Sequence, residues 1–254
     1  MVASGDVQRR RTPFGRNEDH RRDPRPDEGL SSDDVREWRK VLCSIGSGPH
    51  GELLDLSGRT FRAYAGRHGY ELDLHWEDPP ADRPAAWAKI PVIQAALVRG
   101  DIVLWIDADA AIVDTSIDIA ELLGMRDLMG LVAKDSPESE GPILNTGVWL
   151  LWNHRRTRRF LRDVWRSTEF IDHKWWENAA VMREPGYQLA PQVRLVAPTQ
   201  MYRRTATLGN EWNSTPGEPS PAPRIVHVPG EPLVDRLSGL EQAVEHLREN
   251  DGNA

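Results

Sequence analysis

The sequence of 254 residues contains one cysteine, Cys43, so no disulfide can form within the chain and a reducing compartment is permitted. It has no apolar run near the roughly 18 residues that cross a bilayer, and its first residues lack the apolar core of a signal peptide. Positive charge is not in excess, since the net charge is −7, which argues against a general nucleic-acid binder. These absences predict a soluble, cytoplasmic protein without a membrane span.

The two ends of the chain differ in composition from its middle. Residues 1–29 are dense in Arg, Asp, Pro and Gly and have Phe14 as their only aromatic residue. Such a segment buries too little apolar area to offset its loss of conformational entropy, so we expect a disordered polar tail. Residues 30–232 are expected to form one domain, and residues 233–254 to contain an amphipathic helix. That helix either packs on the domain or forms a homodimer, and the sequence leaves both open.

An apolar run at residues 102–106 (IVLWI) ends in Asp107 and Asp109. An uninterrupted run of this kind predicts a strand buried on both faces of a covered sheet. Ligands of open α/β sheets bind beyond the carboxyl ends of the strands, and two carboxylates there repel each other unless a cation lies between them. The pattern favours a site for Mn²⁺ or Mg²⁺ with substrate phosphates, and a surface turn after the strand is the alternative.

Strands and helices are expected to alternate around this run. The predicted strands are 41–46, 70–76, 102–106, 128–133, 143–153, 193–196 and 224–230, and the predicted helices are 53–68, 87–98, 118–123, 155–165 and 175–182. The first three strands, separated by helices, have the order of a parallel, doubly wound sheet. The predicted fold class is therefore a single α/β domain with a mainly parallel, mixed sheet flanked by helices.

Several other stretches carry polar residues where a ligand could bind. Ser44 and Gly46 lie at the end of the first predicted strand, which runs into the flexible residues 46–48 (GSG). This run could cradle a phosphate or a nucleoside, but it lacks the Lys of a P-loop and the spacing of a dinucleotide fingerprint. Asn145 begins the second long apolar strand, where it either caps backbone or faces a ligand. Glu177 lies among apolar residues, so its carboxylate needs a partner, either an ion-paired Arg or a ligand. His227 ends a short strand beside a turn, and it is either a satisfied histidine or a ligand.

Three motifs occur in a characteristic order at residues 64–70 (YAGRHGY), 105–110 (WIDADA) and 144–153 (LNTGVWLLWN). Together they resemble the metal-dependent GT-A glycosyltransferases, most closely the family of fungal α-galactosyl- and α-mannosyltransferases and plant xyloglucan xylosyltransferases. The same resemblance extends to residues 87–91 (WAKIP), 176–180 (WENAA) and 227–230 (HVPG). It spans about residues 39–230 and implies a GT-A, Rossmann-like fold.

The resemblance also implies roles on the nucleotide side of the site. Asp109 and His227 would bind Mn²⁺ or Mg²⁺, and Asp107 would contact the ion, through water, or the ribose of the donor. The implied contacts with the nucleotide-sugar donor are Ser44, Gly46, Tyr64, Lys89 and Asp107. The ion would neutralise the charge that grows on the leaving nucleoside diphosphate.

On the sugar side, Asn145 and Glu177 would hold hydroxyl groups, and Asn178 falls where the family usually has Gln, opposite the leaving group. The implied reaction transfers a hexosyl or pentosyl group from a nucleotide sugar, with a UDP-sugar expected, to a hydroxyl acceptor with retention of configuration. A solvated Lys89 and a backbone-capping Asn145 are the alternatives.

The sequence departs from the family in two places. Members usually carry a membrane anchor where this chain has a polar tail, and Glu231 follows the His-x-x-Gly motif where a basic residue is usual, so Arg203 or Arg204 would have to supply the cation. Two other functions therefore remain as alternatives to a glycosyltransferase. One is a non-catalytic nucleotide-sugar-binding protein on a degenerate transferase fold. The other is a haloacid-dehalogenase-type phosphatase, which needs a later acidic pair that is absent here.

Overall fold

The computed structural model describes residues 38–78, 82–123, 130–135, 143–183 and 205–251. The tail predicted at 1–29 and the strand predicted at 193–196 lie outside these residues. The described part forms one compact unit that begins at Trp38.

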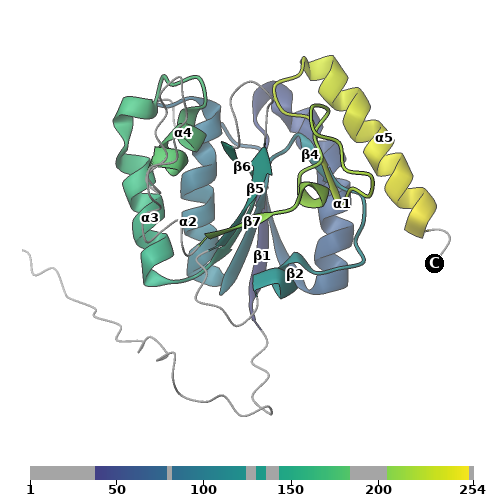
Figure 1. Ribbon diagram of the computed structural model, residues 1–254, viewed down its shortest axis with the longest axis horizontal. Helices are drawn as coiled ribbons and strands as arrows, with labels where there is room; N and C mark the ends of the chain where they lie inside the picture. The colour runs from purple at the N-terminus through teal and green to yellow at the C-terminus, as the bar shows by residue number, and fades with distance from the viewer. Residues whose placement is uncertain (1–37, 79–81, 124–129, 136–142, 184–204, 252–254) are drawn as a thin grey trace, which may run out of the picture. The chain divides into compact units, whose positions relative to one another are not determined.

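Within the described residues, six strands form the main sheet in the order β2-β1-β3-β6-β5-β7 (Figure 1). These strands are β1 Lys40–Ile45, β2 Tyr70–His75, β3 Ile102–Ile106, β5 Gly130–Asp135, β6 Ile143–Trp152 and β7 Thr205–Leu208. Strand β1 pairs in parallel with β2 and β3, as predicted. Strand β6 runs antiparallel to β3 and β5, and β7 is parallel to β5. The sheet is thus mixed, and the predicted α/β class is confirmed.

Helices cover both faces of this sheet (Figure 1). The α-helices are α1 Gly51–His68, α2 Lys89–Arg99, α3 Arg155–Arg166, α4 Trp176–Arg183 and α5 Leu233–Asp251, and short 3-10 turns are η1 Gly48–His50, η2 Ala85–Ala88, η3 Ile119–Leu123, η4 Thr168–Phe170 and η6 Asn210–Trp212. Helix α1 ends at Gly69, which adopts the left-handed conformation with φ 69° and donates its N–H to the carbonyl of Ala65. This is the glycine cap that the sequence pattern predicts.

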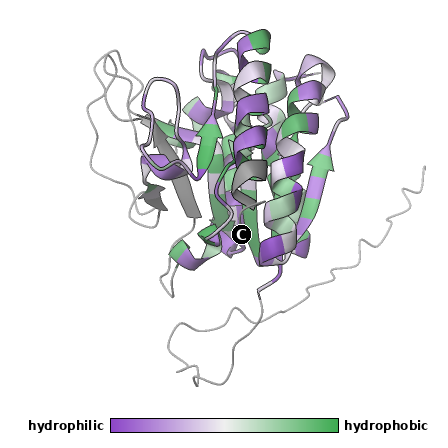
Figure 2. Ribbon diagram, turned by 90° about the vertical axis from the view of Figure 1, so that its right-hand side faces the viewer, coloured by the Kyte–Doolittle hydropathy of each residue, from purple (hydrophilic) through white to green (hydrophobic). Residues whose placement is uncertain are grey.

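The alternation of side chains along the strands divides the core into two layers. Leu42 and Leu104 face one layer with α1 and α5, and Val41 and Val103 face the other with α2, α3 and α4. Figure 2 shows the strands mostly as hydrophobic ribbon behind helices on which polar and apolar turns alternate. Because β3 is buried at every position from Ile102 to Ile106, its apolar run is explained by cover on both faces.

Helix α5 packs back on the domain. Its Leu240 and Ala243 belong to the same buried cluster as Phe61 of α1, and Val244 and Leu247 are buried as well. The apolar stripe of α5 is therefore covered within the chain, which supports the first of the two alternatives for this helix and leaves a homodimer through it without support.

A second, smaller sheet follows β3. Strand β4 Ala110–Ile112 pairs antiparallel with β8 Ile225–His227. The sequence pattern predicts a turn after Asp109 and misses β4, because three residues are too few to show a period. None of the described helices is both long enough and apolar enough to span a bilayer.

Candidate functional site

Two strand ends bring polar residues together at one edge of the main sheet. Because β6 is antiparallel to β3, the beginning of β6 lies beside the end of β3, with Ile106 opposite Val148. The pairing continues one step further, since the backbone N–H of Asp107 donates to the carbonyl of Gly147 at 2.8 Å. The topology therefore places the residues before Gly147 next to the two aspartates, as expected for a site at the carboxyl ends of parallel strands.

The small sheet brings His227 to Asp109. In the pairing of β4 with β8, Ala110 lies opposite His227, and the N–H of Val228 donates to the carbonyl of Asp109 at 3.0 Å. Nε2 of His227 lies 3.2 Å from Oδ1 of Asp109. Residues that are remote in sequence thus meet through two short strands.

Asp107, Asp109 and His227 form a cluster of potential metal ligands, with one atom from each lying within 4.8 Å of the others. Atoms in adjacent positions of an octahedral cation are about 3 Å apart, which matches the separation of the Asp109 carboxylate and the imidazole. Two carboxylates and an imidazole are a donor set that suits Mn²⁺ better than Mg²⁺, because nitrogen ligands favour transition metals. The residues therefore fit a divalent cation.

Asn213 orients the imidazole of His227. Oδ1 of Asn213 lies 2.8 Å from Nδ1 of His227, so Nδ1 carries the proton of this hydrogen bond and Nε2 faces Asp109. In metal-binding histidines generally, the ring nitrogen that does not bind the metal donates a hydrogen bond, and this bond fixes the tautomer. Gly147 makes room for the ring, since a Cβ at this position would lie 2.2 Å from Cε1 of His227.

The charges around Asp109 hold it ionised. Burial by itself would raise the pKa of Asp109, but the hydrogen bond and charge of His227, together with Arg236, lower it overall. Burial by itself would lower the pKa of His227, but Asp109 outweighs this effect and raises it. Nη1 of Arg236, from the first turn of α5, lies 3.2 Å from Oδ2 of Asp109. In this geometry, a proton on His227 and the guanidinium of Arg236 supply the positive charge that a cation would bring.

Asp107 is held by two side chains. Nε1 of Trp105 donates to its Oδ1 at 2.7 Å, and Nζ of Lys89 lies 3.0 Å from the same oxygen. The side chain of Asp107 remains 27% exposed, so it can still reach a ligand.

Lys89 joins Asp107 to Glu177. Its Nζ lies 2.9 Å from Oε1 of Glu177 and donates to the hydroxyl of Thr146 at 3.1 Å. Lys89 is buried, and although burial alone would lower its pKa, the charges of Asp107 and Glu177 raise it. The alternative of a solvated Lys89 is therefore wrong. All three ammonium protons have acceptors, and the ammonium group bridges the two carboxylates. Contact of Lys89 with a donor stays a prediction.

Glu177 forms a buried ion pair with Lys89 instead of with an arginine. Burial raises the pKa of Glu177, and the charge of Lys89 opposes this effect without cancelling it. Its second oxygen, Oε2, is buried and accepts no hydrogen bond from the described residues. A buried carboxylate oxygen without a donor is costly, and a hydroxyl group of a ligand would satisfy it.

The side chains of Asn178 and Asn145 form hydrogen bonds with the backbone. Oδ1 of Asn178 accepts from the N–H of Thr146 at 3.2 Å, and its Nδ2 donates to the carbonyl of Leu144 at 2.8 Å. Oδ1 of Asn145 accepts from the N–H of Gly147 at 2.7 Å. Asn178 thereby ties α4 to β6, and Asn145 makes the backbone cap that was one of its two alternatives.

Ser44 and Gly46 lie at the carboxyl end of β1, on the side of the site. Ser44 is fully buried, and its hydroxyl has no partner among the described residues. A Cβ on Gly46 would lie 2.4 Å from the carbonyl oxygen of His50, so the missing side chain allows η1 to turn tightly over the strand end. The structure thus gives Gly46 a role in the backbone and leaves ligand contact by Ser44 a prediction.

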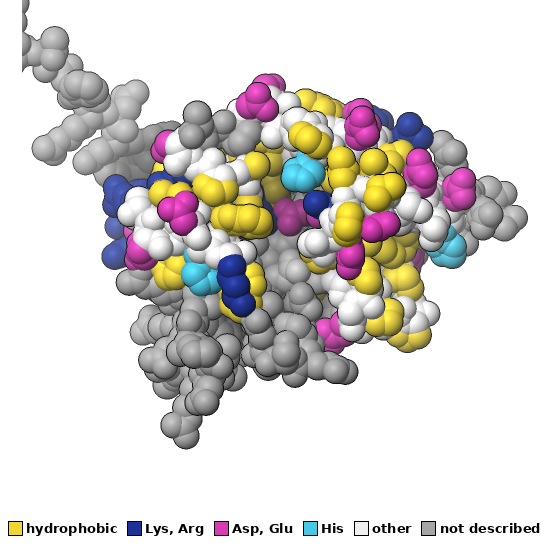
Figure 3. All heavy atoms as spheres, turned by 90° about the horizontal axis from the view of Figure 1, so that it is seen from above, with side chains coloured by type: hydrophobic (Ala, Val, Ile, Leu, Met, Phe, Trp, Pro, Cys, Tyr) yellow, Lys and Arg dark blue, Asp and Glu magenta, His cyan; other side chains and the backbone are white. Residues whose placement is uncertain are grey.

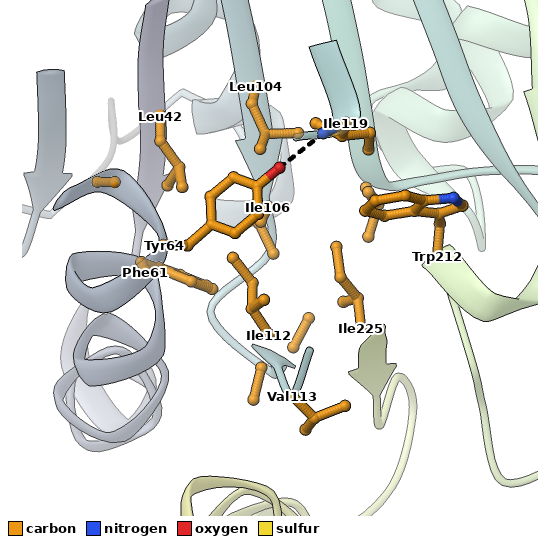
Figure 4. Close-up of a cluster of buried hydrophobic side chains, with 14 of the residues drawn as sticks. Leu42, Phe61, Tyr64, Leu104, Ile106, Ile112, Val113, Ile119, Trp212 and Ile225 are labelled. Carbon is orange, nitrogen blue, oxygen red and sulfur yellow. Dashed lines mark hydrogen bonds between the residues drawn. The ribbon is translucent and has the colours of Figure 1, made fainter. Parts of the chain in front are cut away.

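Tyr64 does not lie in the site, contrary to the prediction from the resemblance. It follows the beginning of α1 by thirteen positions, or roughly 20 Å of helix, and α1 runs back from the site edge of the sheet. Its ring is buried with Phe61 and Leu104, and its hydroxyl accepts from the N–H of Ile119 at 2.7 Å (Figure 4). The motif at residues 64–70 therefore marks the core and the cap of α1.

Four residues of the site were missed in the sequence: Trp105, Gly147, Asn213 and Arg236. Trp105 and Gly147 lie inside motifs that the resemblance quotes, so their positions carried a signal. Asn213 lies in the loop after η6, and Arg236 lies in the first turn of α5, where local pattern gives no signal. Arg203 and Arg204, the expected cations, lie outside the described residues.

Figure 3 shows the molecule from the edge where these residues lie. Acidic, basic and histidine side chains meet around a hollow near the middle of this face, and hydrophobic side chains border it. The arrangement suits a ligand with both charged and apolar parts.

Comparisons with known proteins agree with the motifs. A model of the galactosyl transferase GMA12/MNN10 family matches residues 47–142. An uncharacterized alpha-1,2-galactosyltransferase of Schizosaccharomyces pombe is 34% identical over 88 residues, which are 32% of this chain and 24% of that protein. This chain therefore aligns with about a quarter of the length of that relative. The predicted resemblance to this family is confirmed over the matched residues.

Solved structures share the fold over most of the chain. A glycosyltransferase involved in the glycosylation of the major capsid of PBCV-1 superposes with a TM-score of 0.62 at 16% identity, covering 80% of this chain and 99% of that one. The galactosyltransferase LgtC, in complex with donor and acceptor sugar analogs, superposes with a TM-score of 0.56 at 10% identity, covering 82% of this chain and 95% of that one. The predicted GT-A fold is confirmed.

Proposed function

We propose that this protein is a glycosyltransferase that moves a hexosyl or pentosyl group from a nucleotide sugar, a UDP-sugar, to a hydroxyl acceptor. One observation carries the proposal: Asp107, Asp109 and His227 converge beside the buried Lys89–Glu177 pair at the edge of a GT-A sheet where ligands bind. The matching family and both reported structural relatives are glycosyltransferases, which supports the same activity here.

The metal side of the proposed site consists of Asp107, Asp109 and His227. These residues would hold Mn²⁺, or Mg²⁺, and the bound ion would neutralise the diphosphate as its charge grows. His227 is ready to take part because Asn213 directs Nε2 toward Asp109.

Arg236 is a second cation for the diphosphate. Its Nη1 lies 3.2 Å from Oδ2 of Asp109, and its Nε donates to the carbonyl of Glu231 at 2.7 Å. If Asp109 binds a cation, Arg236 would be available to pair with a phosphate oxygen, for which its planar donors are suited. This would fill the role of the basic residue that the His-x-x-Gly motif lacks.

The sugar side of the proposed site is Glu177, with Asn145 and Asn178 beside it. Oε2 of Glu177 would accept a hydrogen bond from a sugar hydroxyl, and Lys89 holds its other oxygen so that the carboxylate stays in one orientation. Asn178 keeps a second N–H for the sugar after donating one to Leu144. Retention of configuration follows from the resemblance and is part of the proposal.

Calorimetric titration of UDP, with and without Mn²⁺, tests the metal side. Wild type should bind UDP much more tightly with Mn²⁺. Asp109→Asn keeps the shape and removes a charge, so it should abolish the metal-dependent part, and His227→Ala should weaken it because one ligand of three is lost. If both variants bind like wild type, these residues are not the metal site.

Turnover separates an enzyme from a binding protein. UDP-galactose is the first donor to test, because the matching family and relative are named galactosyltransferases, followed by UDP-glucose and UDP-xylose. Glu177→Gln and Asn178→Ala should lower the release of UDP about tenfold or more while UDP affinity stays near wild type. Tight UDP binding without any release of UDP from these donors would favour the non-catalytic alternative.

The phosphatase alternative has no support from the geometry. Both oxygens of Asp107 face Lys89, and Oδ1 also accepts from Trp105, so its carboxylate is engaged and poorly placed to attack a phosphate. Hydrolysis of p-nitrophenyl phosphate by wild type would revive this alternative.

A further inference from the structure

We infer that the exposed face of α3 binds the surface of a membrane that contains anionic lipids, through the guanidinium groups of its arginines. The inference goes beyond the proposed function and does not depend on it, because it concerns the exposed face of a helix and not the residues around Asp109 and His227.

Helix α3 carries a dense group of arginines. Residues 153–162 (NHRRTRRFLR) contain five arginines and no acidic residue, in a chain whose net charge is −7. A sixth arginine ends the helix, and all six are exposed: Arg155, Arg156, Arg158, Arg159, Arg162 and Arg166. Figure 3 shows basic side chains gathered along the side of the molecule that α3 occupies in Figure 1.

This arrangement is unfavourable for the helix itself. Arginines that are three or four positions apart, such as Arg158 and Arg162, lie side by side on the helix surface and repel each other. The first turn contains Arg155 and Arg156 and no acidic residue, although the backbone dipole favours negative charge at this end of a helix. The stability of α3 therefore does not explain its sequence.

The arginines of α3 also have little acidic company. A solvated helix face usually carries both signs of charge at the spacing of ion pairs. Within the described residues, the arginines of α3 form one ion pair, in which Nε of Arg159 lies 3.6 Å from Oδ2 of Asp163, and the side chain of this arginine is still 76% exposed. Exposed pairs of this kind contribute little, so the guanidinium groups remain free to bind an external anion.

The composition of the exposed face argues against a protein or a nucleic acid as its partner. Every exposed position of α3 is an arginine, because Phe160, Leu161 and Val164 point into the core. The core of a protein interface is apolar and depleted of charged residues, and this face offers no such core. A nucleic-acid-binding domain is generally basic as a whole, whereas this chain is acidic.

An anionic lipid surface has the properties that this face requires. Lipid headgroups move freely in the plane of the membrane, so they can gather at each arginine without a shaped pocket. A helix of twelve residues is roughly 18 Å long, and a row of charges on it can lie flat on a plane. The planar donors of arginine pair with phosphate oxygens, and the negative surface potential attracts each basic residue near it.

Sedimentation of the full chain with lipid vesicles tests this inference. The vesicles contain phosphatidylcholine alone or phosphatidylcholine with phosphatidylglycerol, and both kinds are used at about 0.1 M and about 1 M salt. The variant is Arg158→Gln with Arg162→Gln. The matched control is Arg59→Gln with Arg62→Gln on α1, which removes the same charge from exposed positions in the other layer of helices.

Wild type should bind the vesicles that contain phosphatidylglycerol at about 0.1 M salt, and about 1 M salt should release it because the charges are screened. The α3 variant should bind about 30-fold more weakly, from a factor of about five for each arginine. Its melting temperature should not fall, because the substitutions remove like charges that repel each other. The α1 control should bind as wild type does.

The inference is overturned if wild type does not bind anionic vesicles or binds neutral ones equally well. An equal loss in the α3 variant and the α1 control would overturn it too, since net charge alone would then explain the binding. A labelled oligonucleotide or polyglutamate that binds through the α3 arginines, without binding to the vesicles, would overturn lipid as the partner. These outcomes are independent of UDP binding and turnover, which test the proposed function.

Discussion

Two buried carboxylate clusters lie at opposite edges of the same sheet, and they are built differently. At the edge where β1 and β2 begin, Asp118 accepts from Nζ of Lys40 at 2.6 Å, from the hydroxyl of Tyr70 at 2.7 Å and from the N–H of Ala120 at 2.9 Å. Burial alone would raise the pKa of Asp118, but these donors lower it. The charge of this cluster is fully paired.

At the edge where β3 ends, the carboxylates are crowded instead. Asp107 and Glu177 share the ammonium group of Lys89, and the pKa of Glu177 is raised by its burial. Oε2 of Glu177 has no donor among the described residues. The two clusters contain the same kinds of residue, yet one is complete and the other leaves acceptors for a ligand.

A structural carboxylate and a functional one can be distinguished by their hydrogen-bond donors and by their pKa shifts. Burial and ion pairing are common to both clusters and therefore do not discriminate. What differs is whether the donors satisfy every oxygen and whether the fold favours the ionised form. Asp118 meets both conditions and Glu177 meets neither, so substitutions at the two edges should affect different properties.

The largest effect should follow from breaking the complete cluster. Asp118→Asn removes the charge that Lys40 and Tyr70 surround, so we expect a loss of about 2–4 kcal/mol in the free energy of unfolding at neutral pH. Glu177→Gln should cost less than about 1 kcal/mol, because the fold already disfavours the ionised Glu177. Urea denaturation of both variants measures this, and a larger loss for Glu177→Gln would reverse the comparison.

The next effect concerns the space beside His227. Gly147→Ala places a Cβ 2.2 Å from Cε1 of the imidazole, so the ring must move from Asp109. We expect Mn²⁺-dependent affinity for UDP to fall about 100-fold, equivalent to about 2.7 kcal/mol. Gly66→Ala is the matched control, since its Cβ would meet nothing within 4 Å. Calorimetry of both should show the loss at Gly147 only, and equal affinities would remove His227 from the site.

A smaller effect is expected at Asn213. Asn213→Leu fills a similar volume but cannot accept the proton of Nδ1 of His227, so the imidazole loses its preference for one tautomer. Metal affinity should fall about 10-fold or more, as is usual when the partner of a ligating histidine is removed. Nitrogen-15 spectra with diamagnetic Zn²⁺ report the tautomer, and an unchanged tautomer in the variant would show that Asn213 does not set it.

The smallest effect is the pH dependence of the complete cluster. Because the pKa of folded Asp118 is below its ordinary value of 3.8, its contribution to stability is fully present above pH 3.8 and is lost as pH falls through the folded pKa. The difference in unfolding free energy between wild type and Asp118→Asn should therefore be constant from pH 7 to about 5 and shrink below pH 4. Denaturation at pH 7, 5 and 3 measures it, and a constant difference would mean that ionisation of Asp118 is not the cause.

The parts of this protein that depend on local pattern can be predicted from the sequence. The hydrophobic periodicity and the glycine cap predicted β1, α1, β2, α2 and β3 in the right order, because amphipathic faces and a glycine cap depend on neighbouring residues. The order of three motifs indicated a GT-A fold. The apolar run that ends in Asp107 and Asp109 predicted a cation site, and the resemblance added His227 to it.

How these parts meet is visible only in the folded protein. The antiparallel direction of β6 and the pairing of β4 with β8 depend on contacts between remote residues, and strands as short as β4 carry no period of their own. Tyr64 could be placed in the core only once the direction of α1 was known. Asn213, Gly147 and Arg236 join the site because the fold brings a loop, a strand and a helix to Asp109 and His227. A site is defined by distances in space, and separation along the chain does not determine those distances.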